Sequence, residues 1–148
     1  MSLSKNIDQA FLQAMRDKNQ DVLSVLRMLK SAIKNKSIEM MGKELTEDDI
    51  IATVKSEIKK RKDSAEAYKQ GLRQDLVDKE LAEVKVLEEY MPEQLSLEEV
   101  KIKVQEVIAE LAEEDKTNFG KVMRSVMEAL KGQADGSVVG QAVKEILG

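Results

Sequence analysis

Residues 46–71, TEDDIIATVKSEIKKRKDSAEAYKQG, decide the fold. The stretch opens with a capping sequence, in which Thr46 is followed three residues later by the acidic Asp49, and it ends at Gly71, a helix-stop residue. Apolar residues recur between these ends at helical spacing. They are Ile50, Ile51, Val54, Ile58, Ala65 and Tyr68. The stretch therefore predicts a long amphipathic helix with one stripe facing a core.

The same helical periodicity continues on both sides of this stretch, and strand signals are almost absent. Each helical segment is preceded by a residue type that caps helix N-termini. The expected caps are Ser4, Asn19, Asp75, Ser96 (with Glu99 in a capping box) and Thr117 or Asn118, and Asp135-Gly136-Ser137 is expected to form a turn plus a cap for the last helix. The sequence predicts an all-α protein.

The only proline, Pro92, marks a change in charge balance. Residues 1–92 carry 17 basic and 17 acidic side chains, whereas residues 93–148 carry 7 basic and 11 acidic ones, which accounts for the whole net charge of −4. We predict a helical domain over residues 1–92 and a three-helix tail domain over residues 96–148. The tail is small for an independent core, so we expect it to pack against the first domain or a partner.

The composition of the 148 residues excludes several familiar kinds of active site. There is no histidine, hence no imidazole general base, and no cysteine, hence no thiolate nucleophile, disulfide or zinc finger. Neither a P-loop nor a GxGxxG sequence occurs. We expect no catalytic residue, no cofactor and no metal site.

The chain also lacks the features of membrane and secreted proteins. No apolar run approaches the ~20 residues of a membrane span, and the N-terminus has no apolar signal-peptide region. We expect a cytoplasmic protein without membrane contacts; its oligomeric state stays open.

Two charged residues fall on faces that should be apolar. Arg61 lies inside the apolar stripe of its helix on a helical wheel, and Glu80 lies inside the stripe of the next helix, with Glu83 at the edge. In an antiparallel pair of helices, Arg61 and Glu80 are predicted to form a buried ion pair that fixes the register. The alternative is a polar site for a ligand or an RNA phosphate.

Basic side chains gather in two places. Lys59, Lys60 and Lys62 surround Arg61 and point to different faces, which is typical of a solvated helix. In the tail, Lys121, Arg124 and Lys131 are predicted to project from one face of a single helix, opposite its apolar stripe, next to Gly132 and the start of the last helix. Such a surface suits phosphate, because cations and free backbone N–H groups lie together. The alternative for the tail is an exposed face whose cations complement the helix dipole.

Two series of residues, in order, resemble the GatB/YqeY family, and above all its free-standing members in low-GC Gram-positive bacteria. The first is Arg61-Lys62-Asp63-Ser64, Tyr68, Arg73-Gln74-Asp75-Leu76, Glu80, Glu83, Tyr90-Met91-Pro92 and Leu95. The second is Gly120-Lys121-Val122-Met123, Met127 and Lys131-Gly132-Gln133-Ala134-Asp135-Gly136. The resemblance covers essentially the whole chain.

The resemblance implies relation to the C-terminal region of the GatB component of the tRNA-dependent amidotransferase, which helps to hold tRNA while other parts of the enzyme perform the chemistry. Our leading hypothesis is a non-catalytic helical module for tRNA handling, with Lys121, Arg124, Lys131 and Gly132 as contacts, assisted by Lys59, Lys60 and Lys62. One alternative is a protein–protein adaptor that docks a partner on the tail. A second alternative is a carbon–nitrogen ligase with glutamine as amide donor, as the family resemblance implies.

Overall fold

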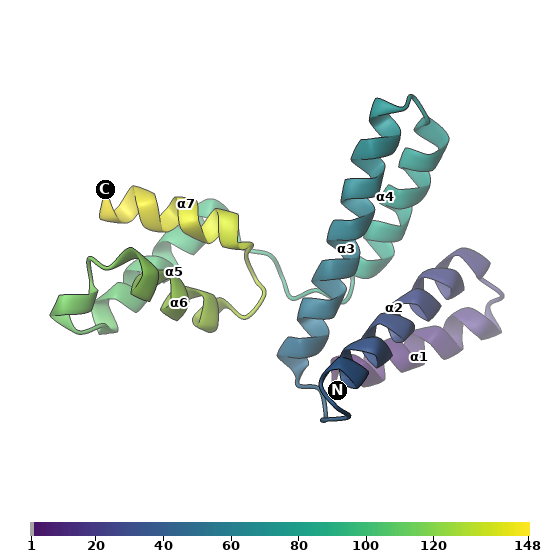
Figure 1. The fold of residues 1–148 in the computed structure, drawn as a ribbon, viewed down its shortest axis with the longest axis horizontal. Helices are drawn as coiled ribbons and strands as arrows, with labels where there is room; N and C mark the ends of the chain where they lie inside the picture. The colour runs from purple at the N-terminus through teal and green to yellow at the C-terminus, as the bar shows by residue number, and fades with distance from the viewer. Residues whose placement is uncertain (1) are drawn as a thin grey trace. The chain divides into compact units, whose positions relative to one another are not determined.

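The computed structural model describes residues 2–148, and within that range it contains seven α-helices, one short 3-10 helix and no strand (Figure 1). The helices are α1 (Leu3–Arg16), α2 (Gln20–Glu39), α3 (Glu47–Gln70), α4 (Gln74–Glu88), α5 (Leu97–Glu110), η1 (Glu113–Asp115), α6 (Phe119–Leu130) and α7 (Gly136–Leu147). The all-α prediction is confirmed.

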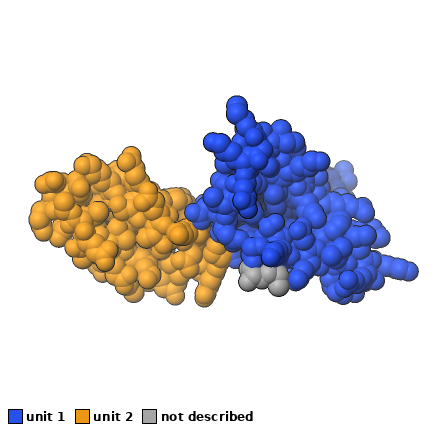
Figure 2. All heavy atoms as spheres, turned by 90° about the horizontal axis from the view of Figure 1, so that it is seen from below, with its two compact units in different colours: residues 1–91 blue, residues 92–148 orange. Residues whose placement is uncertain are grey.

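The chain divides into two compact units, residues 1–91 and residues 92–148 (Figure 2). Each unit has its own aliphatic core. In unit 1 the fully buried side chains include Ile7, Leu26, Leu29, Val54 and Leu87. In unit 2 they include Val100, Val104, Val122, Val126 and Val139. Cores of this kind follow from the composition, because aromatic residues make up only 3% of the chain.

Local capping sets where α3 begins and ends. The Thr46 hydroxyl accepts from the Asp49 N–H, while the Asp49 carboxylate accepts from the Thr46 N–H at 2.9 Å, so the predicted capping box is present. The hydrogen bond from the Thr46 backbone N–H, and after it the interaction with the Thr46 side chain, lower the pKa of the Asp49 carboxylate below its ordinary value of 3.8. Gly71 is the C-cap residue, as expected.

Two of the expected caps are wrong. Ser2 caps α1, because its hydroxyl accepts from the Lys5 N–H, whereas Ser4 lies inside the helix. At the start of α4 the N-cap residue is Arg73, and the Asp75 carboxylate accepts two hydrogen bonds from the Arg73 guanidinium. That contact lowers the pKa of Asp75 and occupies the side chain that was expected to cap.

In unit 2, local signals again place the helix ends. Ser96 and Glu99 form the predicted capping box of α5, and Asn118 caps α6 by accepting from the Lys121 N–H. Asp135 is the N-cap residue of α7 but makes no side-chain cap hydrogen bond. A Lys101–Glu145 ion pair joins α5 to α7. It raises the pKa of Lys101 and lowers that of Glu145.

Helices α3 and α4 form an antiparallel hairpin that positions the buried charges of unit 1. The two helices pack side by side, and α2 contacts both (Figure 1). They are joined by a tight turn at Gly71–Arg73, in which Leu72 adopts a left-handed φ of 58°. Residues equally distant from Leu72 therefore lie level with one another across the hairpin.

Candidate functional site

Arg61 is the most deeply buried charged side chain described, with only 6% of it exposed. Its Nη1 donates to the backbone oxygen of Glu57 at 3.1 Å and lies 3.6 Å from Glu57 Oε1. Its Nη2 donates to the thioether of Met28 at 3.6 Å, a weak acceptor. Its Nε lies 3.9 Å from Glu83 Oε2 and has no hydrogen-bond acceptor in the described chain. Arg61 is thus paired electrostatically but incompletely hydrogen-bonded.

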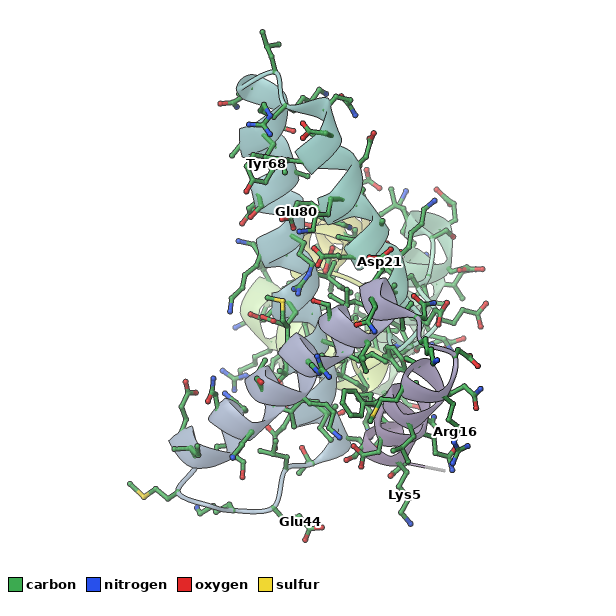
Figure 3. The ribbon with its side chains drawn as sticks, turned by 90° about the vertical axis from the view of Figure 1, so that its right-hand side faces the viewer. Lys5, Arg16, Asp21, Glu44, Tyr68 and Glu80 are labelled. Atoms are coloured by element: carbon green, nitrogen blue, oxygen red, sulfur yellow. The ribbon has the colours of Figure 1, made fainter. Side chains whose placement is uncertain are left out.

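The predicted partner of Arg61 was wrong. Within residues 2–148 its ion pairs are to Glu57 and Glu83, and Glu80 makes none with it. The physical reason is the hairpin register, because Arg61 and Glu83 are each eleven residues from Leu72, whereas Glu80 lies nearer the tip (Figure 3). Glu57 was missed, although an acidic residue four positions before an arginine is a recognisable pairing signal on a helix.

A groove of about 580 Å³ lies between α2 and α3. We call it the α2–α3 groove. It is lined on α2 by Arg27, Met28, Ser31, Ala32, Asn35, Lys36 and Glu39, and on α3 by Ala52, Thr53, Ser56, Glu57 and Lys60. Because Glu57 and Met28 line the groove and also contact the guanidinium of Arg61, the buried arginine lies directly behind its wall.

Several polar side chains in this groove have no partner in the part of the chain that the structure describes. Arg27, Ser31, Asn35 and Ser56 are exposed and make no side-chain hydrogen bond or ion pair within residues 2–148. The other cations are engaged: Lys60 Nζ lies 3.1 Å from Glu57 Oε2, and Lys36 Nζ lies 4.0 Å from Glu39 Oε2. The groove thus offers a free guanidinium, two hydroxyls and an amide.

A smaller cavity of about 370 Å³ lies between α2 and α4. Its lining includes Glu83 together with Asp21 and Lys79. The two carboxylates that neutralise Arg61 therefore face different cavities, Glu57 the α2–α3 groove and Glu83 the smaller one. The buried ion cluster links both sides of α2.

The basic run on α3 does not gather into one surface. Lys59 lies 3.6 Å from Asp63 and Lys60 pairs with Glu57, while Lys62 is exposed and unpaired in the described chain. Only Lys60 among the three lines the groove. Cations already paired with carboxylates contribute less attraction to an incoming phosphate than free ones do.

The tail residues occupy one side of α6 and its end. Lys121 and Arg124 are exposed on the face opposite the buried Val122 and Val126, and Lys131 follows as the C-cap residue. Lys121 Nζ donates to Asp115 at 2.7 Å, whereas Arg124 and Lys131 have no ion-pair partner within residues 2–148. We call Lys121, Arg124 and Lys131 the tail cation surface.

Only a short turn in the sequence separates Lys131, at the end of α6, from the N-terminus of α7. Lys131 and Gly132 have left-handed φ values of 42° and 84°. The carbonyl of Gly132 accepts from Gln94 Nε2 at 2.9 Å, which fixes the turn to the start of unit 2. The first turn of α7 has no acidic residue, and the Asp135 side chain does not cap it. The arrangement can accept an anion at a helix N-terminus.

Comparison with known proteins gives a family match over nearly the whole chain. Residues 4–147 match the family described as Yqey-like protein. The chain is 33% identical over 138 residues to "Altered inheritance of mitochondria protein 41, mitochondrial" of Pyrenophora tritici-repentis, covering 91% of this chain and 75% of that protein. It is also 33% identical over 123 residues to the protein of the same name in Kluyveromyces lactis, covering 78% of this chain and 66% of that protein.

The names of these fungal relatives place them in mitochondria. In the described part of this chain, residues 2–148, none of the helices combines the length and the apolar character needed to cross a membrane.

Proposed function

The chain belongs to the YqeY-like family, and on that premise we propose that it is a non-catalytic helical module that binds tRNA through the tail cation surface. The tRNA assignment draws on the resemblance to the C-terminal region of the GatB component of the amidotransferase. The exposure and the free charges of two tail cations support it.

One observation carries the proposal: Arg124 is exposed on α6, Lys131 is the exposed C-cap residue about two helical turns further on, and neither has an ion-pair partner in the described chain. A free guanidinium and a free ammonium retain their full attraction for phosphate oxygens. Arg124 and Lys131 belong to the unit that carries the net negative charge of the chain. Their positive charges therefore reduce, locally, the repulsion between the acidic tail and RNA.

Backbone geometry supports the same surface. The N–H groups at the start of α7 follow the turn that holds Lys131 and Gly132. Contacts from cations and a helix N-terminus fix an RNA backbone in position without reading its sequence. The proposed module therefore recognises the shape and charge of a tRNA body rather than a base sequence.

Binding of bulk tRNA to the purified chain at low salt tests this proposal. The double variant Arg124→Gln/Lys131→Gln should weaken binding about tenfold or more, since two phosphate contacts are lost. The matched control is Lys5→Gln/Arg16→Gln, which removes the same charge from exposed, unpaired positions on α1 (Figure 3). Equal weakening by both variants would show only a net-charge effect and would reject the tail cation surface.

We also propose the cytoplasm as the location of this chain. Its charged composition and lack of cysteine suit a reducing compartment. Fractionation of cells that express the chain with a C-terminal tag tests the assignment, and recovery in an organelle or membrane fraction would reject it.

A further inference from the structure

We propose that the α2–α3 groove is a second binding site, which takes a phosphate monoester carried on a polyhydroxylated group such as ribose. The site lies wholly within unit 1 and is separate from the tail cation surface. The proposal does not depend on the proposed function, because it concerns different residues and a different unit.

The size and lining of the groove set the class of ligand. Its volume of about 580 Å³ lies in the range of small-molecule sites, roughly 300–1,000 Å³. No aromatic side chain lines it, so it offers no stacking surface for a nucleobase. The lining instead offers the hydroxyls of Ser31 and Ser56 and the amide of Asn35, which match the hydrogen-bonding groups of a sugar phosphate.

The charges of the groove favour an anion. Arg27 is unpaired in the described chain and supplies the free positive charge of the lining. The two lysines of the lining are paired with carboxylates, Lys36 with Glu39 and Lys60 with Glu57. The carboxylate of Glu57 is neutralised by Arg61 and Lys60 together, at 3.6 Å and 3.1 Å. A planar guanidinium can donate two parallel hydrogen bonds to a phosphate, which makes Arg27 the expected phosphate contact.

The remaining free groups are placed for hydroxyl recognition. Ser31 and Asn35 are one turn apart on α2, and Ser56 lines the groove from α3. An amide and a hydroxyl each both donate and accept hydrogen bonds, as does every hydroxyl of a sugar. Thr53 is different, because its hydroxyl already donates to the backbone oxygen of Asp49 at 2.9 Å.

Arg61 supplies an independent observation behind the groove wall. The guanidinium of Arg61 is buried, its Nε lacks an acceptor in the described chain, and its Nη2 has only the Met28 thioether, so its hydrogen-bonding capacity is not fully used by the fold. Its contacts with Glu57 and Met28 hold two residues of the groove lining in place.

The test is an NMR titration of the ¹⁵N-labelled full chain with ribose 5-phosphate, with inorganic phosphate, and with a short 5′-phosphorylated oligoribonucleotide. We expect saturable shifts of the Ser31, Asn35 and Ser56 amide signals with ribose 5-phosphate, at lower concentration than with inorganic phosphate. Arg27→Gln should raise the dissociation constant about tenfold. Arg16→Gln, the same change at an exposed, unpaired arginine of α1, should leave it unchanged.

The three ligands separate the two sources of this chemistry. Tighter binding of ribose 5-phosphate than of the oligonucleotide assigns the groove to a free metabolite, and the reverse assigns it to the end of an RNA strand; either supports the site. Shifts that are absent, that fail to saturate, or that Arg16→Gln weakens as much as Arg27→Gln does would overturn it. Because tRNA binding by the tail cation surface is measured separately, failure here leaves the proposed function standing.

Discussion

Arg61 of α3 and Glu83 of α4 lie opposite each other across the hairpin, with Arg61 Nε 3.9 Å from Glu83 Oε2. Each is eleven residues from Leu72, the centre of the turn. The turn thus decides which acidic residue of α4 meets the arginine, and the intrahelical Glu57 completes the buried cluster. Two carboxylates and one guanidinium are held together where water has little access.

Replacing Arg61 by methionine should destabilise unit 1 by about 3–5 kcal/mol, because Glu83 would lose the ion pair with Arg61 and Glu57 would keep only its pair with Lys60. Urea unfolding followed by tyrosine fluorescence measures the change. Both tyrosines of the chain, Tyr68 and Tyr90, lie in unit 1, so this signal reports that unit alone. An unfolding midpoint equal to that of the wild-type chain would show that the two carboxylates do not need the arginine.

Two further variants test whether Arg61 pairs with Glu83 rather than with Glu80. Glu83→Gln should be strongly coupled to Arg61→Met in a double-mutant cycle, whereas Glu80→Gln should be additive with it to within about 0.5 kcal/mol. Coupling of Arg61 with Glu80 and none with Glu83 would contradict the register seen across the hairpin.

Lys131→Gly should change stability and binding in opposite directions. Lysine has a steric cost of about 1 kcal/mol in the left-handed conformation, and glycine does not, so the tail should become more stable by up to that amount. The same change removes a cation and should weaken tRNA binding. Hydrogen exchange of the α6 and α7 amides measures stability, since the tail has no tyrosine or tryptophan. A tail that loses stability would show that the lysine side chain makes structural contacts.

Acidification should weaken unit 1 partly through Asp49. The Thr46 hydrogen bonds lower the pKa of Asp49 in the folded chain, so this carboxylate stabilises the fold above its unfolded pKa of 3.8. That contribution is lost as the pH falls through the lower, folded value. Asp49→Asn keeps an oxygen acceptor but cannot titrate, and it should flatten the stability profile below about pH 4. If the substitution left the free energy of unfolding unchanged at every pH between about 5 and 2, Asp49 would not contribute to the loss of stability in acid.

The purified chain should not amidate mischarged tRNA. The sequence lacks histidine and cysteine, and the Glu57 carboxylate in the groove is neutralised by Arg61 and Lys60 rather than left to act as a base. Incubation of Glu-tRNA(Gln) with glutamine, ATP, Mg²⁺ and the chain, followed by analysis of the released amino acid, should yield glutamate only. Formation of glutaminyl-tRNA would establish the chain as a carbon–nitrogen ligase.

The sequence alone predicted the features that depend on residues adjacent in the chain. The all-α class, the capping boxes at Thr46 and Ser96, and the Gly71 stop are local patterns, and the structure contains them. Asp75 was misassigned because its carboxylate has a competing local partner, Arg73. Such competition between adjacent side chains is not visible in a capping pattern.

Features that depend on how the helices pack could not be predicted from the sequence. A helical wheel places Arg61 and Glu83 near the inner faces of their helices. Which acidic residue pairs with Arg61 depends also on the length of the turn and on the register of the two helices. The α2–α3 groove was not predicted at all, because its free side chains come from two helices and look like ordinary surface residues in each. They are Arg27, Ser31, Asn35 and Ser56.

The most direct test of the account is the salt dependence of tRNA binding by the wild-type chain and by Arg124→Gln/Lys131→Gln. The logarithm of the binding constant should fall linearly with the logarithm of salt concentration, because each phosphate contact releases counterions. Removing two contacts should make the slope shallower by about two. An identical slope for both proteins, or no binding at low salt, would contradict tRNA binding through the tail cation surface.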